Sequence, residues 1–266
     1  MKKAITVLLL LSVISVSAHE FWLQPSRFIY EGGEKVVIKL MVGENFEGQN
    51  WTGDSSRVNS LILWGRSGHS PLSTRNWVKG DSITILLAPD VQQGSAMITF
   101  NSKNSFIELE ASKFNAYLEE DGLRNAIEYR REHNETDSIG HESYQRSVKT
   151  IFQVGKRKDS SILKRTELPL DIVPINHPLL VPDRQKMSFR IYFNNSPLAD
   201  QLVKIWFKEN GKTIKEELLT DQDGIVSFRL KRSGTWMIST VKMIRLQNDP
   251  KAQWQSYWGS CTWGYE

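Results

Sequence analysis

Short runs of β-branched and aromatic residues, each bounded by glycine, asparagine, aspartate or serine, constrain the fold of this chain more than any other feature. The first half has such runs at residues 28–30, 36–42, 57–64, 82–87, 96–100 and 105–110. The second half has them at residues 168–173, 186–193, 201–208, 213–219, 225–230, 235–243 and 254–263. Runs of this length with turn residues between them are typical of antiparallel sandwiches. The sequence therefore predicts a mostly β protein.

A different pattern interrupts these runs between residues 113 and 135. Apolar residues recur there at helical spacing on either side of Gly122, namely Phe114, Tyr117, Leu118, Leu123 and Ile127. This spacing predicts two short helices that are separated at the glycine. The second β region resembles an immunoglobulin-like or transthyretin-like module. The expected architecture is thus two sandwich regions of this type with a helical insertion.

The first eighteen residues have the pattern of a secretory signal peptide. Lys2 and Lys3 precede an apolar run that ends at the small-residue sequence Val16-Ser17-Ala18. This run is shorter than the roughly 20 apolar residues that a membrane-spanning helix needs. We therefore expect cleavage after Ala18, export to the periplasm and a mature chain that does not itself span the membrane. The predicted organisation is a signal peptide (1–18), an N-terminal β-sandwich region (19–112), a helical insertion and connector (113–165) and a C-terminal immunoglobulin-like region (166–266).

The net charge and the single cysteine argue against nucleic-acid binding and against an intramolecular disulfide. The formal net charge is +4, and loss of Lys2 and Lys3 lowers it further. A charge this small and scattered does not indicate binding to nucleic acid. The single cysteine, Cys261, cannot form an intramolecular disulfide, and we expect it to be a buried small apolar residue.

Motifs of the common enzyme classes are missing from the sequence. There is no H-x-x-x-H pair, no C-x-x-C, no G-x-S-x-G and no phosphate-binding loop. The acidic pairs Glu108/Glu110 and Asp221/Asp223 are explained by a strand face and a turn, and nothing places them across a cleft as glycoside hydrolysis requires. The sequence therefore predicts a protein that is not an enzyme.

The predicted cleavage makes His19 the first residue of the mature chain. Its free α-amine and its imidazole can together chelate a transition metal, and such nitrogen ligands suit nickel, cobalt and copper ions. Glu20 is the carboxylate expected to orient this site. A second possibility is the polar stretch that holds His133 and His141, although charged residues commonly collect in solvated loops.

Several motifs resemble those of the DUF4198 family of exported bacterial proteins. These are the opening His19-Glu-Phe-Trp-Leu-Gln-Pro25, Val42-Gly-Glu-Asn-Phe-Glu-Gly48, Lys113-Phe-Asn-Ala-Tyr-Leu118, Glu120-Asp-Gly-Leu123, Tyr144-Gln-Arg-Ser-Val-Lys149, Gly234-Thr-Trp236 and Trp254-Gln-Ser-Tyr-Trp258. Members are often labelled periplasmic components of cobalt/nickel uptake systems. The resemblance implies that the protein binds a metal and passes it to a membrane transport component.

One position departs from the resemblance. The family pattern implies Val-His-Met where this chain has Val241-Lys242-Met243, and a charged lysine is a poor metal ligand. His141 or a carboxylate would then have to supply the remaining donor. The alternative that the sequence leaves open is a metal-free β-sandwich module that binds a cell-envelope protein or a glycan.

Overall fold

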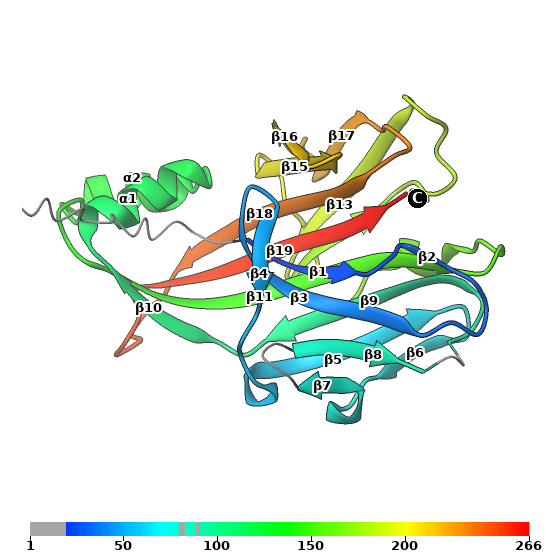
Figure 1. Cartoon of the computed structure of the whole chain (residues 1–266). Helices are drawn as coiled ribbons and strands as arrows, with labels where there is room; N and C mark the ends of the chain where they lie inside the picture. The colour runs from blue at the N-terminus through cyan, green and yellow to red at the C-terminus, as the bar shows by residue number, and fades with distance from the viewer. Residues whose placement is uncertain (1–19, 80–82, 89–90, 266) are drawn as a thin grey trace, which may run out of the picture.

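The computed structural model describes residues 20–79, 83–88 and 91–265 of the 266-residue chain, and the strands in these parts form three sheets (Figure 1). The first is a five-stranded sheet in the order β1-β3-β8-β7, with β4 paired to β3. Its strands are β1 (Glu20–Pro25), β3 (Val36–Glu44), β4 (Glu47–Asn50), β7 (Trp77–Lys79) and β8 (Ile83–Leu87).

The second is a ten-stranded sheet in the order β16-β15-β18-β19-β11-β9-β5-β6, and β2 and β10 both pair with β11. Most neighbours are antiparallel, but β11 runs parallel to β19 and to β2. Its strands are β2 (Ile29–Tyr30), β5 (Val58–Gly65), β6 (Gly68–Pro71), β9 (Gly94–Ser102), β10 (Ser105–Leu109), β11 (Gly140–Val154), β15 (Leu202–Glu209), β16 (Lys212–Leu219), β18 (Thr235–Arg245) and β19 (Trp254–Gly264).

The third is a four-stranded sheet in which β13 pairs with the other three strands. Its strands are β12 (Leu170–Pro174), β13 (Lys186–Phe193), β14 (Ser196–Pro197) and β17 (Ile225–Arg229). Short 3₁₀ turns lie in the connections at Ser55–Arg57, Thr74–Asn76 and Ser160–Leu163.

The ten-stranded sheet separates two hydrophobic cores. The five-stranded sheet packs on one face, which we call the N-terminal face, and the four-stranded sheet packs on the other, the C-terminal face. Strand β9 is buried along its whole length because successive side chains enter different cores, as Met97 and Ile98 do. The central sheet therefore belongs to both sandwich regions.

Two helices, α1 (Ala111–Glu120) and α2 (Arg124–Glu132), cover one end of the ten-stranded sheet (Figure 1). Phe114, Tyr117 and Leu118 face inward from α1 and pack with Met243 and Trp254 of β18 and β19. The helices lie on the N-terminal face, because Tyr117 stacks on Trp258 with ring centroids 5.5 Å apart.

The chain turns between the two helices at Gly122. This residue has a φ of 62° and lies against Leu202, so a side chain there would be both strained and crowded. The predicted break at the glycine is confirmed.

The predicted fold class, mostly β with a helical insertion, is confirmed. Strand β11 falls within the predicted connector, residues 113–165, and pairs with β9 on one side and β19 on the other. No helix in the described parts of the chain combines the length and the apolar character that a membrane crossing requires.

Candidate functional site

The candidate site lies where β1 crosses the ten-stranded sheet. Ser260 Oγ donates a hydrogen bond to the carbonyl oxygen of Phe21 at 2.7 Å, and Thr262 Oγ1 donates one to Leu23 at 2.6 Å. These bonds fasten β1 over β19. They also place Glu20, the first described residue, over the N-terminal face.

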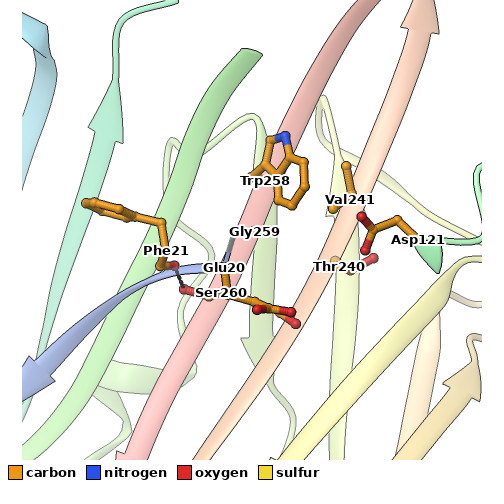
Figure 2. A pocket seen from close by; sticks show the side chains of 9 residues that line it. Glu20, Phe21, Asp121, Thr240, Val241, Trp258, Gly259 and Ser260 are labelled. Atoms are coloured by element: carbon orange, nitrogen blue, oxygen red, sulfur yellow. Dashed lines mark hydrogen bonds between the residues drawn. The ribbon is translucent and has the colours of Figure 1, made fainter. Parts of the chain in front are cut away.

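Glu20 borders a narrow cavity between β1, β18, β19 and the end of α1 (Figure 2). The space that a water-sized sphere can reach is about 10 Å³, which is room for about one water molecule. The lining residues are Glu20, Phe21, Asp121, Ser239, Thr240, Val241, Trp258, Gly259 and Ser260.

The charges beside this cavity do not balance. Lys204 Nζ donates to Asp121 Oδ1 at 2.7 Å and lies 4.0 Å from Glu120 Oε1. The Glu20 carboxylate also feels the charge of Lys204, so this ammonium group lies near two buried carboxyl groups and the half-exposed Glu120, and the charge of Lys215 also acts on Asp121. The second oxygen of Asp121, Oδ2, is buried and has no hydrogen-bond partner within the described residues.

Burial makes the carboxyl groups of this cavity hard to ionise. Loss of solvent raises the pKa of Glu20 to about 7 and that of Asp121 to about 6, although the nearby Lys204 lowers both. Glu20 and Asp121 also raise each other's cost of ionisation, because each carries the same charge. The site therefore has an excess of buried acid that a further positive charge would neutralise.

A third buried acid, Glu142, lies close by under α1. Its Oε1 accepts hydrogen bonds from Ser256 Oγ and from the Tyr117 hydroxyl at 3.3 Å. Trp258, which lines the cavity, donates through Nε1 to Ser256 Oγ at 2.9 Å. Burial raises the pKa of Glu142 to about 7, and the charge of Asp121 adds to the effect.

The structure places the predicted site residues in different surroundings. His19 lies outside the described residues, and Glu20 borders the cavity. Successive side chains of β11 point to opposite faces of the sheet. Glu142 points to the N-terminal face, so the neighbouring His141 lies on the C-terminal face, away from Glu20. There it is 3.8 Å from Glu108 Oε1 and near the ring of Phe106.

The loop that holds His133 does not assemble a cation site from the described residues. His133 stacks on Tyr129 with ring centroids 3.8 Å apart. Both carboxylate oxygens of Glu135 instead accept hydrogen bonds from the guanidinium group of Arg245, at 2.9 and 3.1 Å. Among the residues that the structure describes, no group of three or more histidine, cysteine, aspartate or glutamate side chains is arranged to hold a metal.

Lys242, which stands where the family pattern implies histidine, pairs with Tyr257 across β18 and β19. It therefore lies on the C-terminal face with His141, not at the Glu20 cavity. Burial lowers the pKa of its ammonium group.

The sequence did not indicate Asp121 or Lys204 as site residues, and it grouped Glu142 with the polar stretch of His133 and His141 instead of with Glu20. The run Glu119-Glu120-Asp121 has the pattern of a solvated helix end, and Lys204 lies in a strand whose other polar residues, Lys208 and Glu209, are half-buried. A signal was nevertheless present, because Lys204 is the polar residue among the apolar Val203, Ile205 and Trp206.

Fold and cavity together define a β-sandwich protein whose first strand carries a carboxylate into a buried acidic site. The chain belongs to the family described as a domain of unknown function (DUF4198), whose model matches residues 16–243. No curated protein of similar sequence was found.

Solved structures show only a low likeness to this chain. A DUF4785 family protein from Legionella pneumophila is 9% identical, with 81% of this chain and 51% of that chain covered and a TM-score of 0.22. Elastase-activated Escherichia coli alpha-2-macroglobulin is 8% identical, with 93% and 20% covered and a TM-score of 0.23. This chain thus spans about half of the first protein and a fifth of the second, and neither likeness supports an inference about function.

Proposed function

We propose that the protein is exported, begins at His19 after cleavage, and binds a late transition metal ion, nickel, cobalt or copper, at this N-terminus. The bound ion is then passed to a membrane uptake component. In this proposal the protein is a carrier and not an enzyme.

The observation that carries the proposal is that two buried carboxyl groups, Glu20 and Asp121, lie beside the single buried ammonium group of Lys204. Consecutive Cα atoms are about 3.8 Å apart, so any group on residue 19 starts within one residue of this acidic site. A chain that begins at His19 brings a free amine and an imidazole to that place, whereas an uncut chain brings the same imidazole with a neutral peptide group in place of the amine. A metal ion held there would supply positive charge beyond that of Lys204 and the more exposed Lys215.

The chemistry of the donors fits such an ion. An α-amine has a pKa near 8, so a metal can displace its proton at neutral pH, and the imidazole adds a second nitrogen. Glu20 and Asp121 supply negative charge around the ion and orient its ligands. Trp22, buried two residues further on, fixes the start of β1 against β15 and β18.

Metal titration of two matched proteins tests the proposal. The first begins at His19, and the second keeps Ala18 as one additional residue. We expect nickel, cobalt or copper to bind the first with an affinity at least about 10-fold higher, because the added residue removes the free amine from His19. Isothermal titration calorimetry measures both affinities.

A third protein, Glu20→Gln in the chain that begins at His19, separates the two parts of the site. Weaker binding in this variant would support the role of the acidic cavity. Equal affinity in the first two proteins would remove the His19 amine from the site. Absence of binding in all three would favour the metal-free interaction module.

A further inference from the structure

The outer edge of the ten-stranded sheet at β16 carries an ordered row of backbone groups. Among the described strands only β15 pairs with β16. Asn210 and Gly211 link these two strands with φ values of 50° and 73°, as in a two-residue type I′ hairpin. The closing pair of such a hairpin, Glu209 and Lys212, exchanges backbone hydrogen bonds, and the pairs then alternate along the strands.

This alternation identifies the groups that point outward. At the far end Thr220 N donates to Gln201 O at 3.0 Å, which agrees with even-numbered residues of β16 bonding to β15. The outward N–H and C=O groups therefore belong to Thr213, Lys215, Glu217 and Leu219. The same edge exposes apolar side chains, since Ile214 is 62% exposed and Leu219 is 48% exposed. An open, partly apolar edge of this length is a ready template for another strand.

We propose that β16 pairs with β16 of a second copy of this chain, antiparallel across a two-fold axis, and so joins two ten-stranded sheets. Outward residues must face outward residues in such a pair. The arrangement that gives all four of them a partner places Lys215 opposite Glu217 of the second copy, and Thr213 opposite Leu219. By symmetry the Lys215–Glu217 contact occurs twice.

The charge pattern selects this arrangement over its neighbours. The next possible pairings shift one strand by two residues relative to the other. They bring Lys215 opposite Lys215 or Glu217 opposite Glu217, and like charges across a strand pair are destabilising. On the other side of the paired strands, Ile214 faces Leu218 of the second copy. Lysine at a strand edge commonly discourages pairing, but here each lysine meets a glutamate. The one unfavourable contact is Glu216, which meets its own copy at the axis.

The two charges lie at the protein surface, and Lys215 Nζ also lies 5.5 Å from the centre of the Trp206 ring. Lys215 Nζ and Glu217 Oε1 already lie 2.8 Å apart within one strand, and their side chains are 36% and 42% exposed. Exposed ion pairs of this kind contribute little to stability. A loss of pairing in Glu217→Lys, which keeps the contact of Lys215 with Trp206, therefore reports on the contact between copies.

Sedimentation equilibrium of the exported protein over a series of concentrations up to about 1 mM tests the proposal. We expect a monomer–dimer equilibrium in the unchanged protein. Lys215→Glu and Glu217→Lys should each weaken the dimer by at least about 10-fold, because each places like charges opposite one another twice. The first variant has glutamate at both positions 215 and 217, and the second has lysine at both. An equimolar mixture should therefore form a mixed dimer, in which each glutamate of one chain faces a lysine of the other.

Two further variants sharpen the test. Glu216→Gln should tighten the dimer by removing the repulsion at the axis. Lys113→Glu, an exposed charge reversal on α1, should leave the dimer unchanged. A protein that stays monomeric throughout, or single variants that dimerise as well as the unchanged protein, would overturn the proposal. Single variants that are both monomeric and form no mixed dimer when they are combined would likewise overturn this arrangement of the two strands.

Discussion

Two buried lysines lie on opposite faces of the same sheet, and their surroundings differ. On the C-terminal face Lys149 pairs with Asp171, and their side chains are 1% and 2% exposed. Asp171 also accepts a hydrogen bond from Thr166 N at 2.7 Å, so one cation meets one fully engaged anion. On the N-terminal face Lys204 meets Asp121, Glu120 and Glu20, and Asp121 Oδ2 has no partner within the described residues.

The difference separates a structural charge pair from a site with spare charge. A closed pair such as Lys149–Asp171 holds β11 against β12 and has nothing left to offer a ligand. The cluster around Lys204 has three carboxyl groups, whereas its positive charge comes from Lys204 and the more exposed Lys215. Burial of like charges is costly, so the second arrangement is favourable only when a proton or another cation joins it.

The largest effect is expected for Asp171→Asn. This change leaves the Lys149 ammonium buried without a carboxylate, and loss of one partner of a buried pair costs about 3–5 kcal/mol. Urea unfolding of the purified variant measures the free energy of unfolding. The double variant Lys149→Met/Asp171→Asn should recover much of the loss, and a loss below about 1 kcal/mol in the single variant would contradict the comparison.

The same substitution on the other face, Asp121→Asn, should have a smaller effect. Lys204 keeps Glu20 and Glu120 nearby, and removal of one acid relieves repulsion among those that remain. We expect a loss of about 1 kcal/mol or less in the same urea experiment. Equal losses for Asp121→Asn and Asp171→Asn would show that the two pairs are alike.

Stability of the metal-free protein should fall as pH rises from about 4.5 towards about 7. Burial raises the pKa of Glu142 from 4.5 to about 7 in the folded protein. Between these values the unfolded chain holds fewer protons than the folded chain, so the free energy of unfolding decreases with rising pH. Glu20 and Asp121 act in the same direction.

The variant Glu142→Gln isolates one of these contributions. Its amide oxygen can still accept hydrogen bonds from Ser256 and Tyr117, but the group no longer titrates. Melting temperatures across this pH range should therefore fall less steeply than in the unchanged protein. Glu108→Gln, at a 60% exposed side chain, is the matched control, and a slope as flat as that of Glu142→Gln would contradict the assignment.

The smallest effect is expected for His141→Ala on metal affinity. His141 lies on the face opposite Glu20, so its loss should change the affinity far less than the roughly 10-fold change expected when Ala18 is kept before His19. Calorimetry of the chain that begins at His19 makes the measurement. A larger loss in His141→Ala would move the metal site to the C-terminal face.

Much of the fold could be predicted because local patterns survive in the structure. The range 186–193 matches β13, and the helix break at Gly122 follows from its position between two apolar groups. The parallel pairing of β11 with β19 could not be predicted in this way, because it joins strands more than a hundred residues apart and leaves no local signal.

The site could be predicted only in part. Position alone indicated Glu20, whereas Asp121 and Lys204 meet only after α1 folds against β15, 83 residues away in sequence. His141 illustrates the opposite problem. Its proximity in sequence to other polar residues suggested a shared loop, but β11 begins at Gly140 and sends His141 and Glu142 to different faces.

The contact of β1 with β19 sets a time order for folding. Ser260 bonds to the backbone of Phe21 across 239 residues of sequence, so the first strand gains its final partner only when the last segment has been made. Contacts between such distant segments form slowly. Strand β1 is therefore expected to take its final place over β19 late in folding, after most other strands have paired.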